Sequence, residues 1–363
     1  MNRRLFVAAA LAALLVPAFA STAVTTPTEG AAAAAPSQGL RQFEARSPLA
    51  DGTQISITVV AYQSEEGRAN AAMSQAMGRA QSFYRELFGE GGVEAALGNL
   101  KAGESLALPP DSYSMISKAV DIAAVTGGWF DIAGPSPAGY FTQRDWRRIH
   151  LDPEARTVTM KSDGMKLDLR RISLGYAADI AMEAVAQAGF ANAKVDVGPV
   201  SRIAGRDIFT PWSIQVNFGN AGSSAESAHA HRALSYNVTN IASATVTGKG
   251  LGEGLIDPKN RKPVPADKML SITVLAADAT TATAYALASW TLGPRIGMRF
   301  VEAHPEVRGI LVDNTGKLAA SVGLAAATPS AAPSPEDSGT EVIASEPAPS
   351  EDAPRARDGG TND

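Results

Sequence analysis

Hydrophobic and polar residues alternate with two different periods through the middle of the chain. A period of two predicts strands, and a period of about 3.6 predicts amphipathic helices. On this basis strands are predicted at 55–59, 193–197, 211–218 and 270–274, and helices at 65–88, 112–125, 176–188 and 278–292. Two hairpins are predicted, over 157–169 and over 310–318, because a short Gly-containing turn divides each apolar pattern. Strands and helices mix without a regular βαβ rhythm, which indicates a mixed α/β (α+β) class.

Two of the predicted helices have clear boundary signals. Gly189 follows the helix over 176–188, and Gly293-Pro294 follows the Ala-rich helix over 278–292. Tyr176 and Asp179 fall in the first turn of the helix predicted over 176–188. A carboxylate there is favourable because the amino end of a helix is positive.

Both ends of the chain differ in composition from the middle. Residues 1–20 predict an export signal, with two arginines, an apolar run shorter than the roughly 20 residues that cross a membrane, and the cleavage site Ala18-Phe19-Ala20. The alternative is an uncleaved anchor. Residues 21–39 predict a flexible linker and 326–363 a disordered acidic tail rich in Pro, Ala and Ser, which leaves 40–325 as the folded domain. We therefore expect an exported protein, periplasmic or secreted and soluble, without a transmembrane segment after signal cleavage.

Charge and cysteine content narrow the function classes. The 363 residues carry a net charge of −5, but the tail from 329 onward holds −6, so the remainder is nearly neutral. This balance argues against a nucleic-acid binder, which would need a basic surface. The chain has no cysteine, which excludes disulfides, thiolate metal sites, a cysteine nucleophile and a cysteine-linked lipid anchor.

Two local patterns carry possible chemistry but leave alternatives open. His229 and His231 would share one face of a strand and could chelate a metal, but no third ligand is adjacent and their surroundings favour a solvated loop. Glycine occupies every second position from 248 to 254, next to Lys249, which fits either a phosphate-binding loop or a flexible hairpin tip. No nucleophile elbow, HExxH zinc motif or Walker-type phosphate loop is present.

Three segments, in order, resemble the ApbE-like flavin transferases, the FAD:protein FMN transferases. The first is similar to the TxGxFD element of that family, the second to its DLxxIAKGYAxD run and the following helix, and the third to its HIIDPxTGxPV loop. These segments are Thr126-Gly127-Gly128-Trp129-Phe130-Asp131, then 167–193 beginning Leu167-Asp168-Leu169, then Gly254-Leu255-Ile256-Asp257-Pro258 through Val264. The resemblance spans about 45–320.

The resemblance implies a two-lobed fold with antiparallel or mixed sheets packed by helices. It implies an enzyme that moves FMN from FAD to a Ser or Thr hydroxyl of a target protein, using Mg²⁺ to bridge the pyrophosphate. Carried over by position, FAD would contact Trp129, Phe130, Asp131, Tyr176 and Ile256. The metal would lie beside the backbone of Ser173.

Four positions depart from the family pattern at the reaction centre. Counted back from Gly293, the metal-binding Asp of the family corresponds to Thr283, and the Thr that follows it corresponds to Leu287. The common Lys corresponds to Leu174, and the His before the IDP step corresponds to Gly254. Mg²⁺ prefers anionic oxygen ligands, so a neutral hydroxyl is a poor replacement for the carboxylate, and an apolar side chain cannot bind the ion at all.

Two hypotheses therefore compete. The chain is either a working FAD:protein FMN transferase that holds Mg²⁺ through altered ligands, or an inactive relative that binds flavin or a partner protein. The departures favour lost or altered catalysis.

Overall fold

The computed structural model describes residues 39–134, 145–217, 233–322, 324 and 330–331. The predicted export signal lies outside these residues, as do nearly all of the predicted linker and tail. The candidate metal pair His229 and His231 also lies outside them. No helix formed by the described residues is both long enough and apolar enough to cross a bilayer.

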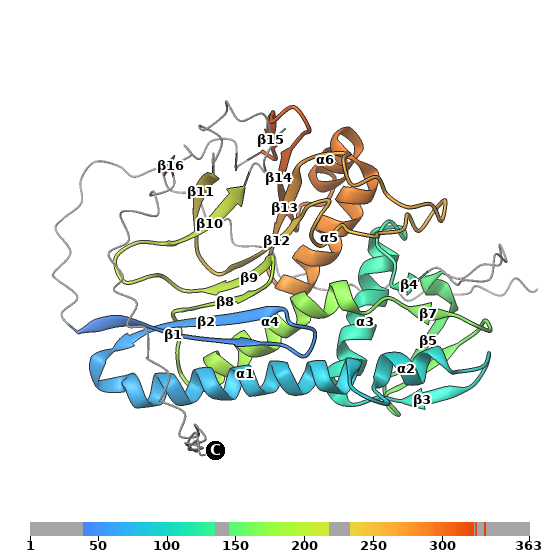
Figure 1. The fold of residues 1–363 in the computed structure, drawn as a ribbon, viewed down its shortest axis with the longest axis horizontal. Coiled ribbons are helices and arrows are strands. Elements are labelled where there is room, and N and C mark those ends of the chain that lie inside the picture. The colour runs from blue at the N-terminus through green and yellow to red at the C-terminus, as the bar shows by residue number, and fades with distance from the viewer. Residues whose placement is uncertain (1–38, 135–144, 218–232, 323, 325–329, 332–363) are drawn as a thin grey trace, which may run out of the picture. The chain divides into compact units, whose positions relative to one another are not determined.

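An eight-stranded antiparallel sheet forms the centre of the fold (Figure 1). Its spatial order is β1 (Leu40–Pro48), β2 (Gln54–Tyr62), β8 (Ala193–Val197), β9 (Val200–Ala204), β12 (Ile241–Val246), β13 (Ser271–Ala276), β14 (Arg308–Val312) and β15 (Leu318–Ala320). The hairpin predicted over 310–318 is confirmed, since β14 pairs with β15 in antiparallel register. The mixed α/β class is likewise confirmed.

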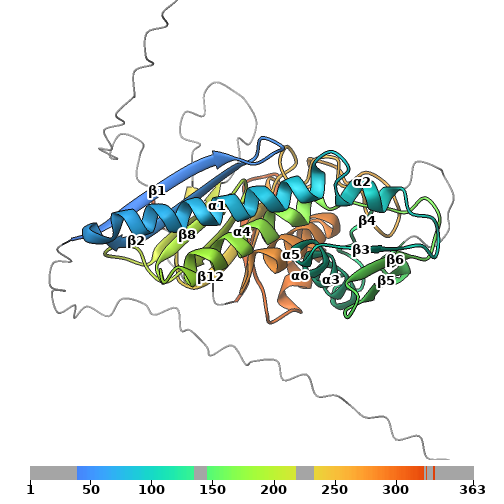
Figure 2. The same cartoon turned by 90° about the horizontal axis from the view of Figure 1, so that it is seen from below.

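Helices cover one face of this sheet (Figure 2). They are α1 (Glu66–Phe88), α4 (Arg170–Gln187) and α5 (Ala279–Leu292), with α6 (Pro294–Glu302) against α5 and β14. The alternating residues Ile55, Ile57 and Val59 of β2 are completely buried in this core. Each such side chain contributes on the order of 1.5–3 kcal/mol through burial. The central strand β13 departs from the predicted alternation, because all six of its residues are buried between layers on both faces.

A second, three-stranded sheet packs on part of the opposite face. It has the order β10 (Trp212–Asn217), β11 (Ala233–Val238), β16 (Ser330–Ala331). Trp212, Ile214 and Val216 are buried in alternation, as the pattern at 211–218 predicts, and they pack in one cluster with Ile203 and Ile310 of the large sheet. The half of that face formed by β1, β2 and β8 carries polar side chains instead.

A smaller lobe adjoins the helical layer, at the right of Figure 1. It contains α2 (Val93–Gly98), α3 (Pro110–Val125), the sheet β3 (Ser105–Ala107), β6 (Thr157–Met160), β5 (Ile149–Asp152), and the short pair β4 (Ala133–Gly134) and β7 (Lys166–Leu167). Two single-turn 3₁₀ helices, η1 (Gln63–Glu65) and η2 (Trp146–Arg148), complete the described elements.

The hairpin predicted over 157–169 is wrong. Strand β6 pairs with β5 and β3, whereas β7 pairs with β4 and leads directly into α4. Asp163, in the predicted turn, instead accepts a hydrogen bond from the backbone of Ala102. The apolar residues Met165 and Leu167 are buried in the main core. Packing against distant residues therefore places β6 and β7 in different sheets, although the local sequence pattern predicted that they pair with each other.

Helix α4 begins six residues earlier than predicted, at Arg170 instead of 176. The predicted helix begins directly after Gly175, and glycine does weaken a helix interior. In the structure this glycine lies where α4 crosses α5, and a Cβ there would come within 2.5 Å of the carbonyl oxygen of Ala279. The absence of a side chain is what allows the two helices to approach.

Candidate functional site

Four of the predicted flavin contacts meet around one small cavity. Its volume is about 30 Å³, and its walls come from the turn after α3, the start of α4, the loop before residue 259, and α5. The lining residues are Trp129, Phe130, Asp131, Asp168, Arg171, Ile172, Leu255, Ile256, Pro258, Leu287 and Thr291. Segments far apart in the sequence thus converge as the motif order suggested. A cavity of this size holds about one water molecule.

The turn after α3 positions Trp129, Phe130 and Asp131. Helix α3 ends at Val125, and Gly127 and Gly128 follow with φ of 60° and 75°. These left-handed conformations favour glycine. The turn then directs Phe130 into the core, where it is 5% exposed.

Asp131 is held by its own neighbourhood. Its carboxylate accepts hydrogen bonds from the backbone N–H groups of Ala133 at 2.8 Å and Trp146 at 3.1 Å. Burial raises the pKa of Asp131 to about 6, and the two backbone donors offset only part of this effect. The carboxylate therefore stabilises the loop that carries it.

The ring of Trp129 is covered by a lysine. The ammonium of Lys259 lies 5.4 Å from the ring centroid and donates a hydrogen bond to the carbonyl of Gly127. Asp257 shapes the loop that brings Lys259 there, accepting from the backbone N–H of Lys259 at 2.7 Å. Arg261, at the position where the family pattern has glycine, adopts φ of 60°. The loop keeps its left-handed turn although the glycine is gone.

Arg171 is a cavity residue that the motif comparison did not single out. Its guanidinium pairs with the carboxylate of Asp168 and donates to the carbonyls of Leu251, at 3.0 Å, and Glu253, at 2.5 Å. It joins the start of α4 to the glycine-rich segment and occupies the cavity between them. One sequence signal could have pointed to Arg171: it is a charged residue at a variable position of the DLxxI run.

The residues at the implied metal position do not fit Mg²⁺. Thr283 is completely buried and donates its hydroxyl to the carbonyl of Ala279 at 2.7 Å. The hydroxyl of Ser173, also buried, donates to the carbonyl of Arg170 at 2.8 Å. Leu287 lines the cavity with an apolar side chain. Within the described residues, no group of three His, Cys, Asp or Glu side chains could hold a metal ion.

Tyr176 lies apart from the cavity walls. Its ring packs against Phe83 with centroids 5.2 Å apart, and its hydroxyl donates to Asp111 at 3.4 Å. Burial raises the pKa of Tyr176 to about 12. In this arrangement Tyr176 joins α4 to α1 and α3.

The glycine-rich segment forms tight turns. The N–H groups of Gly250 and Gly252 donate to the carbonyl of Thr247, and that of Glu253 donates to Gly250. Gly252 packs against the buried ring of Trp290, where a Cβ would come within 2.9 Å of the indole nitrogen. These N–H groups already have partners, so the arrangement does not form a phosphate cradle. Gly254, at the family's His position, has φ of 64°.

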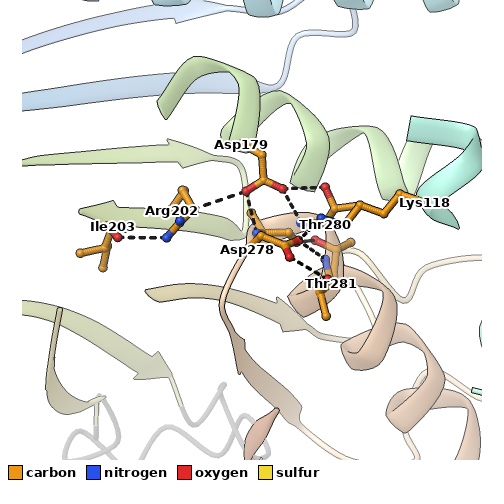
Figure 3. Close-up of polar contacts among 9 residues, drawn as sticks. Lys118, Asp179, Arg202, Ile203, Asp278, Thr280 and Thr281 are labelled. Atoms are coloured by element: carbon orange, nitrogen blue, oxygen red, sulfur yellow. Dashed lines mark hydrogen bonds and ion pairs between the residues drawn. The ribbon is translucent and has the colours of Figure 1, made fainter. Parts of the chain in front are cut away.

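A second polar cluster lies at the amino end of α5 (Figure 3). Asp278 caps the helix by accepting from the backbone of Thr281 at 2.8 Å, and it pairs with Lys118 at 2.7 Å. Asp179, from the middle of α4, accepts from the backbone N–H groups of Ala279 and Thr280. Asp278 therefore serves as a helix cap five residues before Thr283 and does not replace the missing metal ligand.

Comparisons with known proteins give the class to which this architecture belongs. A sequence model of the ApbE family matches residues 135–311. The apo flavinyl transferase ApbE of Pseudomonas stutzeri superposes with a TM-score of 0.64 at 14% identity, covering 79% of this chain and 96% of that one.

Two further solved structures agree. The flavin transferase ApbE of Vibrio cholerae gives a TM-score of 0.63 at 16% identity, covering 80% of this chain and all of that one. The ApbE protein of Thermotoga maritima gives 0.62 at 20% identity, covering 78% and 98%. The search of curated proteins gives no match.

The fold is thus that of the flavin transferases. The sequence match and the shared fold together support an ApbE-like protein of the flavin transferase family.

Proposed function

We propose that this chain is an exported, non-catalytic relative of the flavin transferases in which Mg²⁺-dependent FMN transfer has been lost. The observation that carries the proposal is the chemistry of Thr283 and Leu287. Thr283 has a buried hydroxyl that donates to a carbonyl of its own helix, and Leu287 has an apolar side chain. Without a bound Mg²⁺, its contribution to neutralising the pyrophosphate oxygens of FAD during transfer would be missing.

The small volume of the cavity supports the same conclusion. Arg171 fills the space between α4 and the glycine-rich segment, and Lys259 covers the ring of Trp129. A space of about 30 Å³ does not admit a flavin ring, so FAD would have to displace both side chains. In this arrangement Arg171 pairs with Asp168, another residue of the cavity wall.

Export rests on the sequence of residues 1–20, which predicts a cleaved signal. We accordingly propose a periplasmic or secreted location for a soluble protein. A non-catalytic protein there would act by binding a partner.

Retained FMN transfer is the second candidate, and one observation favours it. Trp129, Phe130, Asp131 and Ile256 still line a common cavity, as the family resemblance implies for a flavin site. In an opened form these residues would hold the aromatic parts of FAD, and a hydroxyl of a target protein would receive FMN. The transfer would then require metal ligands other than those of the family.

An assay for transfer separates the two candidates. The mature protein is first examined for bound-flavin absorbance and then incubated with FAD, Mg²⁺ and a flavin-accepting protein domain, with the Vibrio cholerae transferase as positive control. We expect no bound flavin and no mass increase of the acceptor by FMN. An FMN adduct that EDTA abolishes would overturn the proposal and establish the second candidate.

A further inference from the structure

A much larger cavity lies on the opposite side of the main sheet. It is a groove of about 810 Å³, within the range of roughly 300–1,000 Å³ that is usual for ligand sites. Its floor is the polar half of the face formed by β1, β2 and β8, and its wall is the segment leading into β10 together with β11. It shares no lining residue with the cavity at Arg171.

The groove is lined mainly by side chains that donate or accept hydrogen bonds. Thirteen of its seventeen lining residues have hydroxyl, amide or charged side chains. These are Gln42, Glu44, Arg46, Gln54, Ser56, Thr58, Lys194, Asp196, Asp207, Thr210, Ser213, Ser235 and Asn237. Such a surface does not suit an apolar ligand, because each desolvated polar group would lose its partner.

Four of the five charged side chains in the groove are paired with one another, which reduces their net field, and the fifth, Asp207, accepts from the side-chain amide of Gln42 at 2.6 Å. Glu44 accepts from Arg46 at 2.7 Å and from Ser56 at 2.8 Å. Lys194 pairs with Asp196, two positions further along β8, at 2.9 Å. A strongly anionic or cationic ligand would have to break these pairs, whereas a neutral ligand would use the lone pairs and N–H groups that remain.

An exposed aromatic residue directly precedes the groove wall in the chain. Phe209 is 76% exposed and directly precedes the lining residues Thr210 and Pro211. A flat apolar ring next to many hydroxyl and amide groups matches the two faces of a sugar, whose C–H groups pack on aromatic rings while its hydroxyls donate and accept hydrogen bonds.

We propose that this groove is a binding site for a neutral carbohydrate, with Phe209 packing on a sugar ring and Glu44 and Asp196 accepting from sugar hydroxyls. The site is independent of the flavin-transferase chemistry. It would allow the protein to act as a carbohydrate-binding protein whether or not FMN transfer is retained.

The test is saturation-transfer difference NMR on the mature full-length protein with neutral cello-, malto-, xylo- and chito-oligosaccharides, followed by titration calorimetry on those that bind. We expect at least one series to bind. Phe209→Ala should weaken that binding about tenfold or more without lowering the melting temperature, because the ring is mostly exposed. Ile296→Ala, which shortens an exposed side chain on α6, is the matched control and should bind like the wild type.

A second variant tests the polar floor. Glu44→Ala removes the acceptor shared by Arg46 and Ser56 and should also weaken binding. The proposal is overturned if no neutral oligosaccharide binds at millimolar concentration, or if binding is unchanged in both Phe209→Ala and Glu44→Ala. Tighter binding of sulfated dextran or of a basic peptide than of any neutral sugar would also overturn it.

Discussion

Asp179 of α4 caps the amino end of α5, one hundred residues away in the sequence. Its two carboxylate oxygens accept from the backbone N–H of Ala279 at 2.8 Å and of Thr280 at 2.9 Å (Figure 3). Arg202 of β9 approaches the same carboxylate at 3.6 Å. A single side chain thus connects the two central helices with the sheet and satisfies donors that a helix leaves unpaired at its amino end.

Asp179→Ala should destabilise the fold. It leaves two backbone donors without a partner in the protein interior, which costs roughly 1–3 kcal/mol for each buried group. Chemical denaturation followed by circular dichroism measures the loss. Glu183→Ala, one turn further along α4 on an exposed side chain, is the control and should change stability by less than about 1 kcal/mol. Equal effects of the two substitutions would contradict the capping role.

Gly175→Ala should also be destabilising, for a steric reason. The added methyl group would lie 2.5 Å from the carbonyl oxygen of Ala279 and 2.7 Å from the hydroxyl of Thr283, so α4 and α5 would have to separate. Overpacking of this kind costs about 1–3 kcal/mol. Gly78→Ala is the matched control, because nothing lies within 4 Å of its Cβ position in α1. That substitution should be neutral or stabilise by roughly 0.5–1 kcal/mol. A Gly175→Ala protein as stable as the wild type would show that α4 and α5 can accommodate a methyl group where they cross.

Asp131 should make stability depend on pH between about 4 and 6. Its folded-state pKa of about 6 lies above the ordinary value of 3.8, so the folded protein retains a proton that the unfolded chain releases. The contribution of Asp131 is therefore fully present below pH 4 and is lost as the pH rises through 6. The melting temperature of the wild type should therefore fall relative to that of Asp131→Asn as the pH rises across this range. A difference between the two proteins that does not change with pH would refute the raised pKa.

Arg171→Ala should loosen the glycine-rich segment. The substitution removes the donors to Leu251 and Glu253, so hydrogen exchange of the backbone amides over 247–257 should become faster. The enlarged cavity should also quench riboflavin fluorescence more strongly than the wild type does. Arg170→Ala is the control, because Arg170 packs over Phe88 and is not a cavity residue. If both variants exchange like the wild type, Arg171 does not close the cavity.

Mg²⁺ should have no effect on stability. An ion that binds only the folded state raises the melting temperature with its concentration, and its removal lowers it. Because Ser173 and Thr283 donate their hydroxyls to helix carbonyls, scans in millimolar Mg²⁺ and in EDTA should coincide. A rise in melting temperature with Mg²⁺ that EDTA reverses would reveal ligands other than these.

The sequence by itself determined most of the elements and the family. Alternation at 55–59 and 211–218 identified strands with one buried face, and the periodic run at 278–292 identified α5 to within one residue. These patterns are local, because a buried face repeats with the geometry of its own element. Trp129, Phe130, Asp131 and Ile256, which the motif comparison assigned to one site, line the same cavity.

Tertiary structure decided what the local pattern left ambiguous. Gly175 weakens a helix by propensity, yet α4 runs through it because α5 packs against that position. Asp179 therefore lies in mid-helix and caps α5 instead of starting its own helix. Strands β6 and β7 join different sheets because Met165 and Leu167 are buried in the main core.

The closing of the cavity by Arg171 was decided in the same way. A long charged side chain can extend into solvent or bridge two segments. Arg171 bridges them because the folded chain places Asp168, Leu251 and Glu253 within its reach. Partners of this kind are separated by up to 82 residues in the chain. The sequence could therefore name the family, while the state of its reaction centre depends on contacts that form only when the chain folds.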